Sequence, residues 1–268
     1  MQNNKAKRPR ILAVANQKGG VGKTTTTINL GTALAAIGKK VLIFDIDAQG
    51  NASTGLGIRS SSRRLTTYNI LMGDATIAET SIPTIIPNLS LAPSSVDIAG
   101  AEIELAHISN RAFRLRDAFQ MANEDATNYD YIIIDCPPSL NVVTINAMTA
   151  ADALLVPLQC EFFALEGLTQ LMRTVELVKS SLNPKLEIQG LVLTMYDNRN
   201  RLSEQVAQDV RSHFGEKVYN TVIPRNVRVS EAPSHGKPVL IYDHNSTGSR
   251  AYIKLASELI QRERELAA

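Results

Sequence analysis

Short runs of aliphatic residues alternate along the chain with segments whose apolar residues recur every three or four positions. The runs that predict strands are Ile11–Ala15, Val41–Phe44, Leu89–Ala92, Tyr131–Ile134, Ala153–Val156, Ile188–Thr194 and Val218–Ile223. Most of them are apolar at every position, which is typical of strands covered by helices on both faces. The alternation therefore predicts an α/β fold, a doubly wound and mostly parallel sheet flanked by helices.

Four further segments show the spacing of an amphipathic helix, and we interpret their apolar stripes as core packing. The stripes are Leu30, Ala33, Leu34 and Ile37; Leu115, Ala118, Phe119 and Ala122; Leu168, Leu171, Met172 and Val175; and Tyr252, Leu255, Ala256, Leu259 and Ile260. The last helix ends in the mixed charges of Gln261–Glu265, whereas a membrane-surface helix would carry a basic face. We expect a flexible basic tail over 1–10, a single domain over 11–268, and a loop at Ser60–Arg64.

Composition excludes several classes of protein. The chain has 268 residues, 44% hydrophobic and 20% charged, with a net charge of +2, as in ordinary soluble proteins. No apolar run approaches the roughly 20 residues that span a bilayer, and the polar N-terminus is not a secretory signal. Cys136 and Cys160 are too few for a disulfide framework or a four-cysteine zinc site, and we expect both in the core. These features predict a cytoplasmic protein.

A glycine-rich segment, Lys18–Thr25, connects the first predicted strand to the first helix. Glycines let such a loop curl until its backbone amides converge on a phosphate chain at a helix N-terminus. Lys23 can reach the β- and γ-phosphates, and the Thr24 hydroxyl can coordinate Mg²⁺. The strict P-loop pattern is not met, because Gln17 stands where it requires glycine and Lys18 follows. We predict a variant phosphate-binding loop rather than a flexible glycine linker.

Two predicted strands end in carboxylates. Asp135 closes Tyr131–Ile134, and at the C-terminal edge of the sheet it can hold Mg²⁺ through water. Asp45 and Asp47 close the second strand. They could complete the Mg²⁺ shell and orient an attacking water, or they could form a turn or a helix cap, and their spacing favours neither.

Four segments together resemble the ParA/Soj partitioning ATPases, which belong to the deviant Walker-A class and the MinD/ParA superfamily. The segments are Asn16–Thr26, Asp45–Asn51, Ile134–Ser139 and Ile223–Pro238. The resemblance extends over nearly the whole chain and implies a P-loop enzyme that hydrolyses ATP with Mg²⁺. The chain departs from many relatives at one position, Ala48, where they carry proline.

The resemblance implies roles for individual residues. Lys18 matches the signature lysine that reaches the phosphates of the other subunit, and with Lys23 and Asp47 it would form the catalytic set. Thr24, Asp47 and Asp135 would hold the metal, with Asp47 orienting the water, and Pro224 and Asn226 would contact adenine. The residues expected to contact nucleotide are Lys18, Gly19, Gly20, Val21, Gly22, Lys23, Thr24, Thr25, Pro224 and Asn226.

Two sibling groups fit less well. Septum-site ATPases of the MinD type end in a basic amphipathic membrane helix, which this C-terminus does not resemble, so we expect no stable membrane association. Reductases like the nitrogenase iron protein bridge a cluster with cysteines, for which Cys136 and Cys160 are poor candidates. Longer plasmid relatives carry an N-terminal helix-turn-helix, and only ten residues precede the first strand here.

The resemblance also implies partners: an ATP-dependent homodimer, double-stranded DNA bound without sequence preference, and a ParB-type centromere-binding protein that stimulates hydrolysis. A nucleoid-associated location would follow. Isolated surface arginines are usually only solvated, and the resemblance favours Arg199 and Arg228 over the other candidates. The candidate DNA contacts are Arg199, Arg201, Arg225, Arg228, Lys237 and Arg250.

A function of another class stays open, namely a biosynthetic P-loop enzyme in which ATP activates a small substrate. Such an enzyme would need a second pocket with catalytic side chains. The histidines suggest no such cluster, because they lie in unrelated contexts at His107, His213, His235 and His244.

Overall fold

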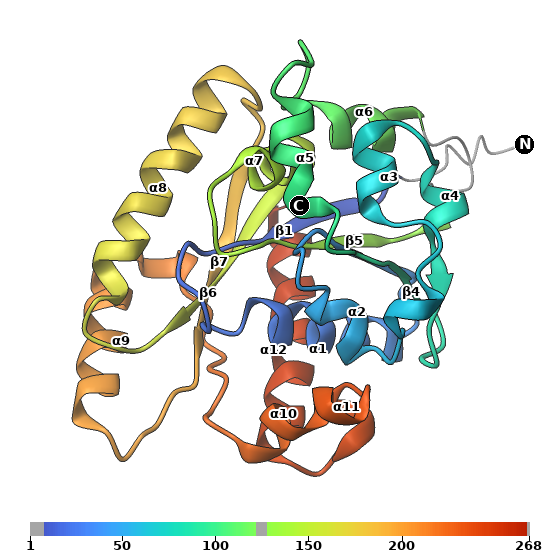
Figure 1. The fold of residues 1–268 in the computed structure, drawn as a ribbon. Coiled ribbons are helices and arrows are strands. Elements are labelled where there is room, and N and C mark those ends of the chain that lie inside the picture. Colours follow the sequence, from blue (N-terminus) through green and yellow to red (C-terminus); the bar gives the residue numbers. More distant parts are fainter. Residues whose placement is uncertain (1–7, 122–127, 267–268) are drawn as a thin grey trace, which may run out of the picture.

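The computed structural model describes residues 8–121 and 128–266 (Figure 1). Its seven-stranded sheet has the order β3-β4-β2-β5-β1-β6-β7, and all neighbouring strands are parallel except β3 and β4. The strands are β1 Arg10–Val14, β2 Val41–Asp45, β3 Ile82–Pro83, β4 Leu89–Ala92, β5 Tyr131–Asp135, β6 Ala153–Gln159 and β7 Glu187–Thr194. The predicted doubly wound, mostly parallel sheet is therefore confirmed.

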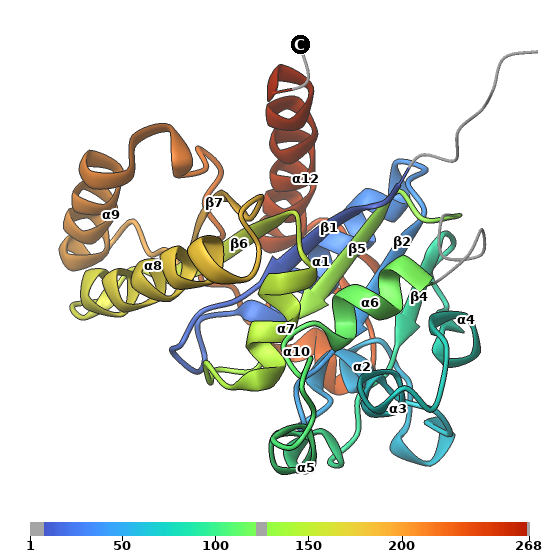
Figure 2. The ribbon, with the colours of Figure 1, turned by 90° about the horizontal axis from the view of Figure 1, so that it is seen from above.

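Helices cover both faces of the sheet (Figures 1 and 2). The α-helices are α1 Lys23–Ala36, α2 Asn51–Gly55, α3 Thr67–Met72, α4 Ile77–Thr80, α5 Ile98–Leu105, α6 Arg114–Met121, α7 Val142–Ala150, α8 Ala164–Ser181, α9 Arg201–Phe214, α10 Val227–Glu231, α11 Val239–Tyr242 and α12 Thr247–Leu266. Short 3₁₀ turns are η1 Ser60–Ser62, η3 Gly215–Lys217 and η4 Ala232–His235. The expected loop at 60–64 thus contains one turn of 3₁₀ helix.

Each face of the sheet has its own core. Ile11 and Ala13 belong to the cluster under α6, α7 and α8, whereas Leu12 and Val14 belong to the cluster under α1 and α12. Because successive side chains of a strand point to opposite faces, a strand buried on both sides is apolar throughout. Both cysteines are buried in the first cluster, as expected for small core residues.

One predicted strand is wrong. Residues 218–223 run beside β7 and form only an isolated bridge there, at Val218. The amides of Asn220 and Thr221 donate to the carboxylate of Glu258, at 2.8 and 2.9 Å. A side chain of α12 thus takes the hydrogen bonds that a strand ladder would use. The short antiparallel edge strand β3 had no corresponding prediction.

The helical stripes are confirmed with one correction. Ile37 is 54% exposed, because α1 ends at Ala36 and the chain turns at Gly38, whose φ is +84°. A glycine in this left-handed conformation commonly terminates a helix. Ala122 and the first seven residues of the expected tail lie outside the described residues. No helix in the described ranges combines the length and the hydropathy needed to cross a bilayer.

Candidate active site

The glycine-rich loop lies between β1 and α1, at the C-terminal edge of the sheet. Gly22 precedes α1 with a φ of +88°, and no side chain caps the helix. No acidic residue occupies the first turn either, so the helix N-terminus is available for an anion. Neighbouring strands hold the loop, since the Asn16 amide donates to Pro157 O and the Thr194 hydroxyl donates to Val21 O, both at 2.8 Å. The conformation of the loop and the uncapped N-terminus of α1 are suited to binding a phosphate chain.

The two lysines of the loop lie in different surroundings. Lys23 is buried, and its ammonium donates to the carbonyl oxygen of Lys18 at 2.9 Å. Burial lowers the pKa of Lys23, while the nearby charge of Asp135 acts in the opposite direction. Lys18 is exposed, and its ammonium pairs with Glu161 at the connection between β6 and α8. Only Lys23 is directed along its own loop.

Asp135, the last residue of β5, is completely buried beside this loop. Its Oδ1 accepts a hydrogen bond from the Thr27 hydroxyl at 3.1 Å, whereas Oδ2 has no partner among the described residues. Burial raises the pKa of Asp135 well above its usual range, and the charge of Asp45 adds to the rise. A buried carboxylate oxygen without a partner, close to Thr24, is a suitable acceptor for a Mg²⁺-bound water.

The two carboxylates at the end of β2 lie in different surroundings. Asp45 is completely buried and accepts hydrogen bonds from the Ser53 amide, the Ser53 hydroxyl and the Asp47 amide, at 2.8, 2.7 and 3.2 Å. It therefore fixes the turn and the first residues of α2. Burial raises the pKa of Asp45 to about 6. Asp47 accepts only the amide of Gln49 through Oδ1, so its Oδ2 has no hydrogen-bond partner within the described ranges.

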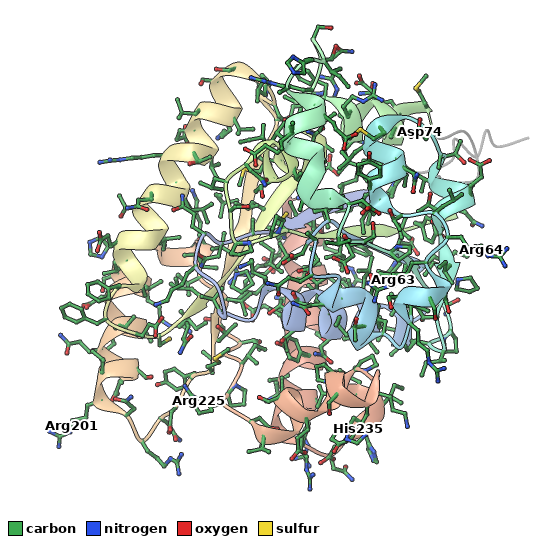
Figure 3. All side chains as sticks on the ribbon, in the orientation of Figure 1. Arg63, Arg64, Asp74, Arg201, Arg225 and His235 are labelled. Atoms are coloured by element: carbon green, nitrogen blue, oxygen red, sulfur yellow. The ribbon has the colours of Figure 1, made fainter. Side chains whose placement is uncertain are left out.

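Arg63 is a residue that the sequence reasoning missed. Its guanidinium donates to the carbonyl oxygens of Ile58 and Ser94 and to the Thr54 hydroxyl, and so ties the segment after Asp47 to the end of β4. In Figure 3, Arg63 lies inward of Arg64. An arginine in a Ser/Arg stretch gave no signal of this role, because only folding brings the Ser94 carbonyl, 31 positions away in sequence, to its guanidinium.

The segment expected to contact adenine lies at the same edge of the sheet. Pro224 forms a bridge with Tyr196, two residues beyond Thr194, the residue that holds the phosphate loop. Asn226 caps α10, accepting the amides of Arg228 and Val229 at 2.9 and 3.3 Å. Its own amide group donates to the Thr247 hydroxyl at 2.9 Å. Adenine contact by Pro224 and Asn226 stays a prediction.

Three of the candidate DNA residues gather around the connection between β7 and α9, namely Arg199, Arg201 and Arg225, and Figure 3 labels two of them. The Arg199 guanidinium holds the pKa of Asp197 down, at about 2. Arg228 lies on α10 and pairs with Glu231 and Asp243, at 3.0 and 3.5 Å. The remaining candidates, Lys237 and Arg250, are exposed near α11 and at the start of α12.

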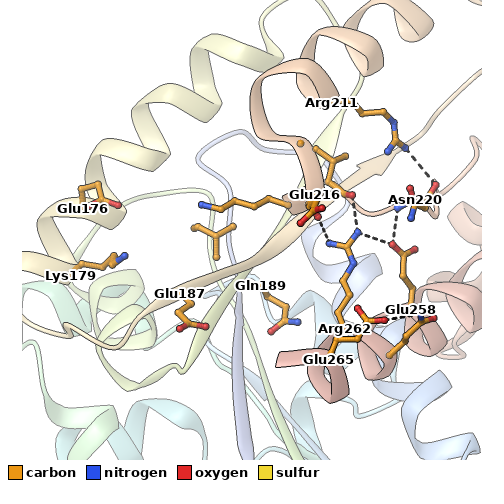
Figure 4. Close-up of a pocket in the computed structure, with 15 residues that line it drawn as sticks. Glu176, Lys179, Glu187, Gln189, Arg211, Glu216, Asn220, Glu258, Arg262 and Glu265 are labelled. Carbon is orange, nitrogen blue, oxygen red and sulfur yellow. Dashed lines mark hydrogen bonds and ion pairs between the residues drawn. The ribbon is translucent and has the colours of Figure 1, made fainter. Parts of the chain in front are cut away.

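A large groove lies elsewhere, at the N-terminal end of β7, with a volume of about 1100 Å³ (Figure 4). Part of its charged lining is paired within the protein. Arg262 donates to Glu258 and to the carbonyl oxygens of Glu216 and Val218, and Glu258 accepts the Asn220 amide. The groove lacks a glycine loop or a free helix N-terminus and is not the phosphate site.

Comparison with known proteins identifies the family of the chain. A family model described as an AAA domain matches residues 9–188. The chain is 65% identical over 259 residues to the chromosome partitioning protein ParA of Caulobacter vibrioides, covering 97% of each chain. It is 53% identical over 250 residues to the sporulation initiation inhibitor protein Soj of Bacillus subtilis, covering 93% of this chain and 98% of Soj.

A solved structure gives the same picture of the fold. A protein from Mycobacterium smegmatis, described as cobyrinic acid a,c-diamide synthase with bound ADP and magnesium, superposes with a TM-score of 0.83 at 36% identity, covering 96% of each chain. The variant phosphate loop, the buried Asp135 and these similarities lead to one conclusion. The chain belongs to the ParA/Soj family of chromosome-partitioning ATPases.

Proposed function

We propose that this chain binds ATP with Mg²⁺, forms a dimer that binds double-stranded DNA without sequence preference, and leaves the DNA after hydrolysis stimulated by a ParB-type protein. The observation that carries the proposal is the uncapped N-terminus of α1, with Lys23 buried on one side and the unpartnered Oδ2 of Asp135 on the other. The relatives named as partitioning proteins support the cellular role. A nucleoid-associated location would follow from it.

ATP binding follows from the donors of the loop. The amides from Gly19 to Thr25 converge on the phosphates, and Lys23 exchanges the carbonyl of Lys18 for the β- and γ-phosphates. Thr24 and Asp135 would hold the Mg²⁺ ion. When bound, the metal would neutralise charge on the transferred phosphoryl group.

Hydrolysis requires a water in line with the bond to the γ-phosphate. Asp47 is the residue that we expect to orient that water. It lies two residues after β2, at the edge where the phosphates bind, and one of its carboxylate oxygens has no hydrogen-bond partner among the described residues. Such positioning lowers the barrier more than it strengthens ground-state binding. Asp45 holds the turn that carries Asp47.

The position of Lys18 supports the proposed dimer. Its ammonium lies at Glu161, away from its own phosphate loop, and about half of the side chain is exposed. In a dimer with facing nucleotide sites, Lys18 of one subunit donates to the phosphates of the other. The contact exists only with nucleotide in place, so dimerisation depends on ATP.

DNA binding follows from basic side chains that the dimer presents twice. Arg199 is 85% exposed on the connection between β7 and α9, with Arg225 close by, and Arg228 lies on α10. Each phosphate contact contributes to a binding free energy that depends on salt and carries no sequence information. Nucleotide-controlled dimerisation therefore controls the affinity for DNA.

A second candidate function is the activation of a small substrate by ATP, which the name of the Mycobacterium smegmatis structure suggests. Two observations favour partitioning. The identity to ParA is 65%, against 36% to that structure. The four histidines are exposed and lie on separate segments, at His107, His213, His235 and His244.

The decisive experiment is a DNA-binding titration with ATP, ADP and no nucleotide, across a series of salt concentrations. Binding that requires ATP, weakens with salt and ignores sequence supports the proposal. ATP-dependent sedimentation with liposomes instead of DNA would point to membrane positioning. ATP turnover that depends on a small molecule and not on DNA or a ParB-type protein would point to a synthase.

A further inference from the structure

Two adjacent aromatic side chains project into solvent between β6 and α8. Phe162 is 74% exposed and Phe163 is 62% exposed, and their rings pack edge to face with centroids 5.1 Å apart. Burying such a ring removes a large apolar surface from water and so favours association. Exposed apolar patches of this kind mark interaction sites more often than scattered single residues do.

The backbone presents the two rings in a fixed way. The amide of Ala164 donates to Glu161 O at 2.9 Å, and the amide of Gly167 donates to Phe163 O at 3.3 Å. The segment is thus anchored to the first turn of α8 while both rings point outward. A preformed aromatic anchor loses little conformational entropy on binding.

The position of the rings indicates which partner they meet. They follow the C-terminal end of β6, at the edge that carries the phosphate loop, and directly follow Glu161, the partner of Lys18. The rings therefore lie beside the lysine that, in the proposed function, reaches a second subunit.

The charges around the rings suit a copy of the same chain. Lys18 and Glu161 form an ion pair next to the rings, and Glu166 adds a carboxylate in the first turn of α8. A two-fold axis places the same surface on both subunits, so a patch with a cation, an aromatic centre and an anion complements itself. Carboxylates next to the rings disfavour DNA phosphates and anionic lipid headgroups as partners.

We infer that Phe162 and Phe163 form the apolar anchor of the ATP-dependent dimer, packing against the second copy of the chain beside Lys18. The inference rests on the proposed function, because it assumes that ATP drives dimerisation. Lys18 makes the dimer depend on nucleotide, and the aromatic pair supplies buried area that one charged contact lacks. Aromatic residues are enriched among the residues that dominate interface energies.

The test is the double variant Phe162→Ala with Phe163→Ala in the full chain. Its dimerisation is measured by sedimentation velocity with Mg²⁺ and a non-hydrolysable ATP analogue, and its affinity for the analogue is measured as the control for folding. Leu177→Ala is the matched control, since Leu177 is also on α8 and 68% exposed but lies toward its other end. We expect a dimer dissociation constant raised at least about tenfold in the double variant and unchanged in the control, with analogue affinity retained.

The outcomes separate the inference from the function on which it rests. A wild-type chain that stays monomeric with the analogue overturns the ATP-dependent dimer, and the inference with it. A wild-type dimer together with an equally stable double-variant dimer overturns the inference alone. A normal double-variant dimer that no longer responds to a ParB-type protein also overturns it, and assigns the rings to that partner.

Discussion

Replacing Asp45 by asparagine separates a structural role for this carboxylate from a catalytic one. Asp45 Oδ2 accepts the amide and the hydroxyl of Ser53, and Oδ1 accepts the amide of Asp47. An asparagine oxygen at the Oδ2 position keeps both bonds to Ser53, but the NH₂ group then faces the amide of Asp47. Leaving that buried amide without an acceptor costs about 1–3 kcal/mol.

The substitution also removes a titrating group. Burial raises the pKa of Asp45 from 3.8 to about 6, and about 2 pKa units correspond to about 3 kcal/mol. Because the raised pKa favours the protonated carboxyl in the folded state, its stabilising contribution is complete below the unfolded pKa and is lost as the pH rises through about 6. Asp45→Asn should therefore be less stable than wild type near pH 4 and gain up to about 3 kcal/mol relative to it by about pH 7.

Two assays follow. Urea unfolding without nucleotide, from about pH 4 to 7.5, gives the difference in stability between the two proteins. ATP turnover at neutral pH should fall less than about tenfold, because Asp47 is retained, whereas loss of the residue that orients the water costs about a hundredfold or more. Asp74→Asn, at an exposed position, is the control.

If the free energy of unfolding of wild type and of Asp45→Asn changed with pH in the same way, the raised pKa of buried Asp45 would be refuted. A hundredfold loss of turnover with normal ATP affinity would move the catalytic role from Asp47 to Asp45.

The remaining predictions concern the other steps of the proposed cycle. Lys23→Ala should abolish ATP binding in equilibrium titrations, since the phosphates lose the cation on their own loop; retained affinity would mean that the site is misplaced. Lys18→Ala should bind ATP as a monomer, and a normal dimer in sedimentation would refute its action across the interface. Asp47→Ala should dimerise and stay on DNA while hydrolysis falls at least about a hundredfold, and wild-type turnover would contradict its role. Arg199→Glu, and more strongly its combination with Arg228→Glu, should abolish DNA binding while the dimer survives. Replacing these arginines by alanine should reduce the slope of log DNA affinity against log salt concentration by about one for each lost phosphate contact. Arg228 also pairs with two carboxylates, so the ATP affinity of its variant is measured together with its DNA affinity. If the variant loses ATP affinity first, Arg228 belongs to the nucleotide site and not to the DNA-binding surface.

The strands of the inner sheet could be predicted because their signal is local. Tyr131–Ile134 and Val41–Phe44 are apolar at every position, and both became buried parallel strands. The run at 218–223 has similar composition but is not a strand, since Glu258, far along the chain, takes two of its amides. Periodicity reports which residues are apolar, and it does not report which distant acceptor competes for a backbone amide.

The same distinction between local signals and distant contacts applies to the residues of the site. The glycine loop and the acid at the end of β5 are recognisable because their roles depend on neighbours in sequence, strand before and helix after. The choice between Asp45 and Asp47 depends on Ser53 and on depth of burial, which spacing does not contain. Arg63 acts through acceptors on three segments, and Phe162 looks like a core residue until its exposure is known.

The two lysines of the phosphate loop show how folding gives one residue type two tasks. Lys23 is buried against the loop, so its charge serves the phosphates bound there. Lys18 pairs with Glu161, and with side chains 44% and 34% exposed such a pair contributes about 0–1 kcal/mol. The same kind of bond to a charged acceptor contributes more where an interface shields it from water, about 1.5–3 kcal/mol. In the proposed dimer the exchange of Glu161 for a phosphate is therefore favourable, and it takes place only where a second subunit brings nucleotide. The weak pair with Glu161 thus keeps the Lys18 ammonium out of its own nucleotide site. It also lets the ammonium bind the phosphates of the second subunit when nucleotide is present there.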